Sequence, residues 1–336
     1  MDAMGETGVQ DGTLRLQREI PVPNSVSATA QAVMRGGCAG VAHRLSNPPV
    51  FPARDDAPGW RERVTATDAM MAPVFRALVS PDTQVEAAVM GSVPIYRITP
   101  VNLNDDVDAL VLFDVHGGAL VGGGGELCAL MSSIAAERVG LPSISVDYRM
   151  PPDDPYPAAL DDCLAVYRAL LVERPADEIL VSGASAGGNL AAAMLLRARA
   201  EGLPMPAGLL LLSPEVDLTE SGDSFATNEG VDYVLVNGLS ESIALYAGDH
   251  DLADPLLSPL FGDLTGFPPT LLQTGTRDLF LSNTVRMHRR LREAGVDAEL
   301  HVWEAMPHGG FFGAPEDQEV IAEVRAFVAK HVSSPR

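Results

Sequence analysis

The sequence predicts an α/β protein with a mostly parallel eight-stranded sheet, flanking helices and a helical cap. From residue 84 onward, short apolar runs alternate with segments of helical periodicity, which is typical of right-handed strand–helix–strand units. The stretch 215–267 interrupts the alternation and is too long for a simple connection, so it predicts an insertion. Hydrophobic residues make up 46% of the chain and charged residues 20%, which indicates a packed core.

Eight segments have the length and apolar content of strands. They are residues 84–90, 94–98, 110–115, 143–148, 178–182, 209–212, 270–274 and 299–303. Helical periodicity predicts helices over 60–78, 158–173, 188–201, 282–294 and 317–332, with helix-like pieces around 239–247.

The N-terminal part is weakly patterned, and Gly36, Gly37 and Gly40 are expected to break any long helix before residue 45. We expect an N-terminal segment, residues 1–80, that contributes to the cap. A catalytic domain is expected over residues 81–336, with the cap insertion at about 215–267.

Charge and hydropathy exclude several classes of partner. The formal net charge is -22 at pH 7, so nucleic acid and anionic membrane surfaces would repel the chain. No apolar run reaches the roughly 18 residues of a membrane span. Residues 1–11 are acidic and lack the apolar core of a secretory leader, which favours a cytoplasmic location.

Three cysteines, Cys38, Cys128 and Cys163, are far apart and odd in number. This spacing predicts neither a disulfide framework nor a zinc site. We expect all three to be buried as small apolar side chains.

The segment Gly183-Ala184-Ser185-Ala186-Gly187 is a G-x-S-x-G motif between an expected strand and an expected helix. That context predicts a sharp turn that presents Ser185 as an exposed nucleophile. Gly183 and Gly187 would leave room where a β-carbon would collide. An ordinary structural turn is the alternative, and the flanking strand and helix favour the nucleophile.

A second motif, His116-Gly117-Gly118-Ala119, follows the expected strand 110–115. Acyl transfer passes through a tetrahedral oxyanion, which preorganised N–H donors stabilise. We expect the oxyanion hole to be formed by the backbone N–H groups of Gly117, Gly118, Ala119 and Ala186, with His116 supporting the motif. A simple glycine turn is the alternative.

A serine nucleophile needs a general base, and the base needs an acid to orient it. His308 lies in the loop after the last expected strand, where the base should be. Asp278 follows the strand 270–274 and is expected to hold His308 in the correct tautomer. The alternative is that Asp278 only caps the next helix.

Together these motifs resemble the bacterial branch of the hormone-sensitive-lipase family of esterases, in the α/β-hydrolase superfamily. The resemblance covers the chain from about residue 85 onward. Its segments are His116–Ala119, Asp147–Pro152, Tyr156–Asp162, Gly183–Gly188, Ser213–Pro214 with Asp217–Thr219, Gly275–Asp278 and His308–Phe311. It implies the α/β-hydrolase fold, a cap made from N-terminal helices and an insertion, and no metal or organic cofactor.

The resemblance also implies a carboxylic-ester hydrolase that cleaves small, short-acyl esters through a Ser185–Asp278–His308 triad and an acyl-enzyme. Its partner would be a small-molecule ester. Neither nucleic acid binding nor stable membrane insertion is expected, and a homodimer is possible. The triad does not distinguish this reaction from lactone or amide hydrolysis or from acyl transfer to an alcohol. A non-catalytic ligand receptor is a further hypothesis, although such a protein is expected to lack a triad member.

One position departs from the family's H-G-G-G motif. Ala119 replaces the third glycine and is followed by Leu120 rather than an aromatic residue. The alanine keeps its N–H group, so the donor survives. Its methyl group is expected to tighten the pocket or to shift the loop.

Overall fold

A computed structural model describes residues 9–10, 12–14, 18–103 and 110–332. The expectation that residues 1–11 carry no secretory leader therefore lies mostly outside the described residues, as do residues 1–8 of the expected N-terminal segment. Among the described residues, no helix is long and apolar enough to span a membrane.

The main sheet contains the eight strands that the sequence predicts, each within two residues of its expected ends. They are β3 (Gln84–Met90), β4 (Val93–Thr99), β5 (Val111–Val115), β6 (Ser143–Val146), β7 (Ile179–Ala184), β8 (Gly208–Leu212), β9 (Thr270–Gly275) and β10 (Ala298–Trp303). A separate short hairpin, not predicted, pairs β1 (Val9–Gln10) with β2 (Thr13–Leu14).

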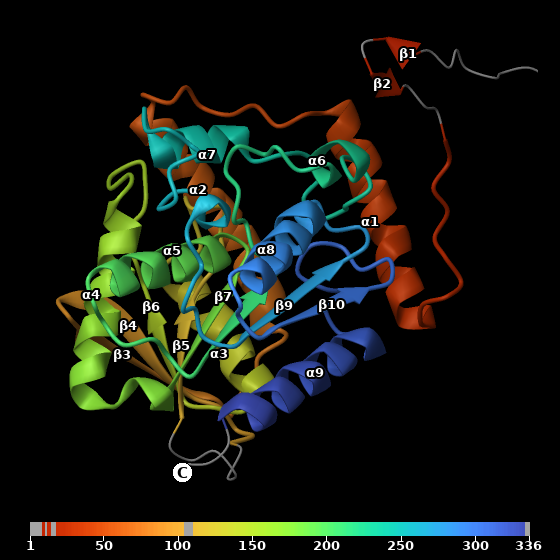
Figure 1. Cartoon of the computed structure of the whole chain (residues 1–336). Coiled ribbons are helices and arrows are strands. Elements are labelled where there is room, and N and C mark those ends of the chain that lie inside the picture. Colours follow the sequence, from red (N-terminus) through yellow and green to blue (C-terminus); the bar gives the residue numbers. More distant parts are fainter. Residues whose placement is uncertain (1–8, 11, 15–17, 104–109, 333–336) are drawn as a thin grey trace, which may run out of the picture.

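The strand order is β10-β9-β8-β7-β5-β6-β4-β3 (Figure 1). β3 pairs antiparallel with β4, and β4 pairs antiparallel with β6, while all other neighbours are parallel. The prediction of a mostly parallel eight-stranded α/β-hydrolase sheet is confirmed. The carboxyl ends of β5, β7, β8, β9 and β10 consequently meet at one edge, where this architecture places its ligand sites.

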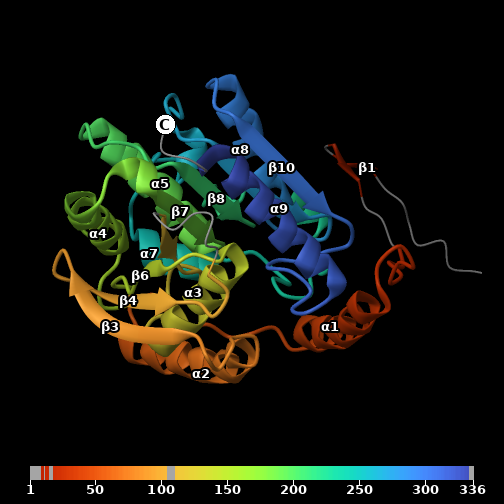
Figure 2. The ribbon, with the colours of Figure 1, turned by 90° about the horizontal axis from the view of Figure 1, so that it is seen from below.

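Helices cover both faces of the sheet. The helices of the described residues are α1 (Ala28–Ser46), α2 (Ala57–Arg76), α3 (Glu126–Val139), α4 (Ala158–Glu173), α5 (Ala186–Ala200), α6 (Ser224–Thr227), α7 (Ser240–Ala247), α8 (Leu281–Glu293) and α9 (Pro315–Val332), with 3-10 turns η2 (Ala176–Glu178) and η3 (Pro259–Phe261). α4, α5 and α8 lie on one face, and α3 and α9 lie on the other (Figure 2).

Side chains along β5 alternate between the two helical layers and pack against both. Phe113 and Val115 point into the core shared with α4 and α5, while Leu112 belongs to the core beneath α9, beside Phe327. Successive residues of a strand face opposite sides, so a strand covered by helices on both faces is mostly apolar. The exception in β5 is Asp114, which is buried and accepts a hydrogen bond from Ser132 Oγ of α3 (2.5 Å).

The expectation that glycines break the N-terminal helix is wrong. α1 runs through all three glycines, and Ser27 caps it by accepting a hydrogen bond from the Ala30 N–H (3.1 Å). A glycine inside a helix costs only about 1 kcal/mol, which burial of an apolar face readily offsets. Here Ala30 and Met34 are fully buried against Phe311 and the loop after β10.

The sequence pattern does not predict α3. Its buried face includes Ser132 and Ser133 as well as Leu127 and Cys128, so the apolar periodicity that marks a helix is diluted. All three cysteines are free thiols. Cys128 and Cys163 are buried as expected, but Cys38 on α1 is exposed, which corrects the expectation for that residue.

Candidate active site

The G-x-S-x-G motif forms the predicted strand–turn–helix between β7 and α5. Ser185 has a positive φ of 56°, a conformation that costs an L-residue about 1–2 kcal/mol. Two backbone hydrogen bonds hold it there: the Ser185 N–H donates to Leu212 O (2.9 Å), and its carbonyl accepts from the Glu215 N–H (3.0 Å). The Ser185 side chain is half-buried rather than fully exposed.

The flanking glycines are required by the close approach of other backbone. A β-carbon on Gly187 would lie 1.9 Å from Val115 O, and one on Gly183 would lie 2.3 Å from Gly187 O. No side chain fits at those distances. The tight elbow therefore brings α5 against the end of β5, which leads into the His116–Ala119 loop.

That loop lies directly beside the nucleophile. A β-carbon on Gly117 would be 3.3 Å from Ser185 Cβ, so the two segments are in contact. Ala186 is the first residue of α5, where backbone N–H groups have no acceptor within the helix. Of the expected oxyanion donors, Gly117 thus contacts Ser185 and Ala186 directly follows it, while Gly118 and Ala119 continue the loop from Gly117.

Ala119 adopts a left-handed conformation with φ 54°, and Leu120 follows with φ 64°. Glycine tolerates this region better than alanine does. The Ala119 methyl group packs against the apolar cluster formed by Trp60 of α2, Val121 and Leu245 of α7. The departure from the glycine motif therefore links the loop to two helices that lie outside the sheet.

His116 supports the loop from below. Its ring stacks on Tyr148 with centroids 4.1 Å apart, and the Tyr148 hydroxyl donates to the His116 carbonyl (2.8 Å). Burial lowers the pKa of His116 to about 4 despite its contact with Gly117 O. The imidazole is therefore neutral near pH 7.

His116, Cys128 and Asp147 bring three metal-ligand atoms within 4.8 Å of one another. Burial raises the pKa of the Cys128 thiol well above its usual value, which opposes formation of the thiolate that a metal needs. Cys128 Sγ lies 3.1 Å from Ser145 Oγ, and Asp147 accepts from the Gly125 N–H (2.9 Å). These contacts fix α3 and β6 beneath the oxyanion loop.

The predicted acid and base are paired. Asp278 is fully buried and lies 3.1 Å from His308 Nδ1; it also accepts hydrogen bonds from Thr274 Oγ1 and the Phe280 N–H, both at 2.8 Å. α8 begins after Phe280 without a side-chain cap. The alternative that Asp278 only caps this helix is therefore wrong.

The electrostatics of this pair are reciprocal. Burial opposes ionisation of Asp278, but the charge of His308 and its hydrogen bond outweigh burial and lower the pKa of Asp278. Burial likewise opposes protonation of His308, and the neighbouring charge of Asp278 outweighs it, so the pKa of His308 is raised. The pair is suited to stabilising an imidazolium.

One contact expected of the triad is not made. Among the described residues, no hydrogen bond joins the Ser185 hydroxyl to His308. Catalytic hydrogen bonds are often long in free enzymes and tighten when substrate binds. The backbone connects the two sites: Ser185 binds Leu212 at the end of β8, and the next residue, Ser213, donates its N–H to Gln273 O of β9 (2.7 Å).

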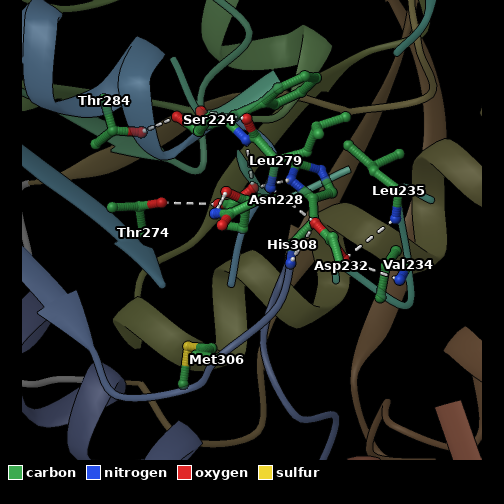
Figure 3. A network of polar contacts seen from close by, with 12 residues as sticks. Ser224, Asn228, Asp232, Val234, Leu235, Thr274, Leu279, Thr284, Met306 and His308 are labelled. Carbon is green, nitrogen blue, oxygen red and sulfur yellow. Dashed lines mark hydrogen bonds and ion pairs between the residues drawn. The ribbon is translucent and has the colours of Figure 1, made fainter. Parts of the chain in front are cut away.

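Two polar residues around this pair, Asn228 and Asp232, were not predicted from the sequence (Figure 3). Asn228 Nδ2 donates to Asp278 O (2.8 Å), and the Asp232 carboxylate accepts from the His308 N–H (3.2 Å). Both residues lie in the insertion, where no sequence pattern marks them.

Asp68 of α2 was also missed. Its carboxylate accepts a hydrogen bond from the Gly123 N–H (3.3 Å), so α2 contacts the glycine run that follows the oxyanion loop. An isolated acidic residue on an amphipathic helix carries no signal of such a contact.

Comparison with known proteins agrees with this fold. The profile of the α/β hydrolase fold matches residues 112–312. An esterase of Acinetobacter venetianus is 37% identical over 225 residues, covering 65% of this chain and 74% of that protein. An acetyl-hydrolase of Streptomyces hygroscopicus is 33% identical over 203 residues, covering 60% and 68%.

Solved structures extend the likeness to nearly the whole chain. The crystal structure of esterase E25 superposes with a TM-score of 0.86 at 36% identity, covering 96% of this chain and 99% of that one. An esterase from the bacterial hormone-sensitive lipase family superposes with a TM-score of 0.74 at 32% identity, covering 90% and 98%.

The chain belongs to the α/β hydrolase fold family. Within that fold it is a carboxylesterase of the hormone-sensitive lipase family.

Proposed function

We propose that the protein hydrolyses small carboxylic esters with short acyl groups, using Ser185 as nucleophile, His308 as general base and Asp278 as the acid that orients it. The observation that carries the proposal is the buried Asp278–His308 pair, 3.1 Å apart, at the sheet edge that also carries the Ser185 elbow. Such a pair has no evident structural purpose beyond holding an imidazole that must bear charge.

The proposed reaction proceeds in two halves. His308 takes the Ser185 proton as Ser185 attacks the ester carbonyl, and the N–H groups of residues 117–119 and Ala186 stabilise the oxyanion. His308 then protonates the leaving alcohol, and an acyl-Ser185 intermediate remains. Water, activated by His308, attacks this intermediate and releases the carboxylic acid.

Two observations favour short acyl groups. Ala119 adds a methyl group to the loop whose Gly117 contacts Ser185, and this methyl group packs with Trp60 and Leu245. One relative is named an acetyl-hydrolase, and one structural neighbour of 25% identity was soaked with p-nitrophenyl butyrate. We also propose that residues 1–80 and 215–267 form the cap, since α2 and α7 meet over the oxyanion loop in that cluster.

The test is hydrolysis of p-nitrophenyl esters from acetyl to palmitoyl by the wild-type protein and by Ser185→Ala. We expect fastest turnover with acetyl to butyryl chains and loss of at least about 1000-fold in the variant. Activity that survives Ser185→Ala would overturn the nucleophile. Preference for palmitoyl esters would overturn the proposed preference for short acyl chains. Turnover of lactones or amides alone would favour those compounds as the substrates.

A further inference from the structure

The insertion contributes a second buried carboxylate beside the Asp278–His308 pair. Asp232 has no exposed surface and lies between α6 and α7, far in sequence from both residues. Figure 3 shows its side chain next to His308, with dashed lines to the backbone around it. A buried carboxylate is costly unless its oxygens accept several hydrogen bonds.

Each Asp232 oxygen accepts two backbone hydrogen bonds. Oδ1 accepts from its own segment, at Val234 N (2.9 Å) and Leu235 N (3.2 Å). Oδ2 accepts from Leu279 N (2.9 Å) and His308 N (3.2 Å). One oxygen atom therefore joins the residue after the catalytic acid to the catalytic base.

Neighbouring residues of the insertion reinforce the same loops. Asn228 Nδ2 donates to the carbonyls of Thr276 (3.2 Å) and Asp278 (2.8 Å), and Ser224 Oγ donates to the Leu279 carbonyl (2.6 Å). The segment from Ser224 to Asp232 thus satisfies backbone groups on both sides of Asp278. Buried backbone groups need such partners, and the Asp278 carbonyl also accepts from the Leu281 N–H (3.1 Å).

α1 fixes this segment from outside. Gly37 lies so close to Tyr233 that a β-carbon there would be 2.4 Å from the ring, and Arg44 donates to the carbonyls of Tyr233 and Val234 (3.1 Å for the latter). Asp232 is therefore held from one side and holds the acid and base loops on the other.

We propose that Asp232 is a positioning residue: it holds the acid and base loops at their working separation and places a second negative charge beside His308. This role rests on the function proposed above. The charged and titratable groups that face it are Asp278, His308 and Tyr233, with Arg44 on the far side of its segment. Burial and the charge of Asp278 raise the pKa of Asp232 to about 6, so it is ionised at pH 8, and its charge adds to that of Asp278 in raising the pKa of His308.

The decisive variant is Asp232→Asn, which keeps the shape but removes the charge and one acceptor. We expect kcat to fall about 10- to 100-fold with KM changed far less, because the base is displaced and substrate contacts are not. The acid limb of the pH profile of kcat/KM should move to lower pH, because His308 loses a neighbouring negative charge. A residue that only supports folding would lower the melting temperature and leave the limb in place.

Asp223→Asn, at an exposed residue just before that segment, is the matched control and should leave kcat and the acid limb unchanged. If Asp232→Asn does not fold, Asp232→Glu replaces it: the retained charge should keep the acid limb near its wild-type position while kcat falls. Wild-type kcat in either folded variant, or an unmoved limb in Asp232→Asn, overturns the proposal.

A second readout separates this proposal from the ester function. The rate at which a fluorophosphonate labels Ser185 depends on the same base, whatever the natural substrate is. Absence of ester turnover in the wild type would overturn the function proposed above, yet the pH dependence of labelling would still report His308. Equal labelling profiles in wild type and Asp232→Asn would overturn the role of Asp232.

Discussion

Single residues at this site are held in conformations that the chain would not adopt alone. Ser185, Ala119 and Leu120 all have positive φ without being glycine. Strained backbone of this kind persists only where surrounding contacts determine it, and it gathers at functional sites. Ser185 is fixed by neighbouring backbone, whereas Ala119 is fixed by side-chain packing against α2 and α7, so its strain is the easier to remove by substitution.

Ala119→Gly tests what the methyl group does. Relief of the left-handed strain, about 1–2 kcal/mol, is opposed by lost burial and by the added freedom of glycine when unfolded. We therefore expect the free energy of unfolding to change by less than about 1 kcal/mol. The ratio of hexanoate to acetate turnover should rise by roughly 2- to 10-fold as the loop gains room. An unchanged ratio would show that Ala119 does not limit the acyl group.

Glu215 predicts a pH-dependent stability. Its N–H donates to the Ser185 carbonyl, its buried carboxylate has no hydrogen-bond partner among the described residues, and burial, with the charge of Glu220, raises its pKa to about 8. Between an unfolded pKa of about 4.5 and the folded value, the native state keeps a proton that the unfolded state loses. Folding is therefore progressively penalised as the pH rises through this window.

Glu215→Gln removes that penalty. Its melting temperature relative to wild type should increase from pH 5 to pH 8 and then level off, as measured by thermal unfolding. Glu241→Gln on the exposed surface of α7 is the control, and its difference from wild type should be flat with pH. A flat difference for Glu215→Gln as well would mean that Glu215 ionises normally in the folded protein.

At the scale of elements, α1 offers a matched pair of substitutions. Gly36 has open space where a β-carbon would be, while a β-carbon on Gly37 would lie 2.4 Å from the Tyr233 ring. Gly36→Ala should stabilise the protein by roughly 0.5–1 kcal/mol through helix propensity. Gly37→Ala should destabilise it and lower turnover, because Tyr233 adjoins Asp232. Thermal unfolding of both variants checks this, and equal effects would contradict the packing of α1 on the insertion.

The strands and most helices could be predicted because the buried side chains of each element follow a local pattern of apolar residues. β8 is an uninterrupted apolar run and β5 is apolar except for Asp114, and the Ser185 and His308 positions follow from strand ends and motif order. α1 could not be predicted, because three glycines lower its local propensity while contacts with Phe311 and Tyr233 stabilise it. Asp232 could not be predicted either, since its partners lie 47 and 76 residues away in sequence.

At the scale of the whole molecule, charge is the dominant feature. The net charge of -22 keeps separate molecules apart in solution. Within each folded molecule, however, the negative charges repel one another. We expect the melting temperature at pH 8 to rise between 10 and 200 mM sodium chloride, because salt screens this repulsion. Thermal unfolding at fixed pH measures it. A fall would mean that surface pairs such as Arg61–Asp153 contribute more than the net repulsion.

The contact between α1 and α9 has a consequence for how the molecule is made. Ser27 donates its N–H and hydroxyl to Glu316 (2.6 and 2.8 Å), 289 residues later in the chain. On the ribosome, α1 is synthesised early and must remain undocked, with Met34 uncovered, until nearly the whole chain has emerged. Since α1 also secures the segment that carries Asp232, the acid–base pair would be locked last. Nascent chains would then stay catalytically silent until translation is almost complete.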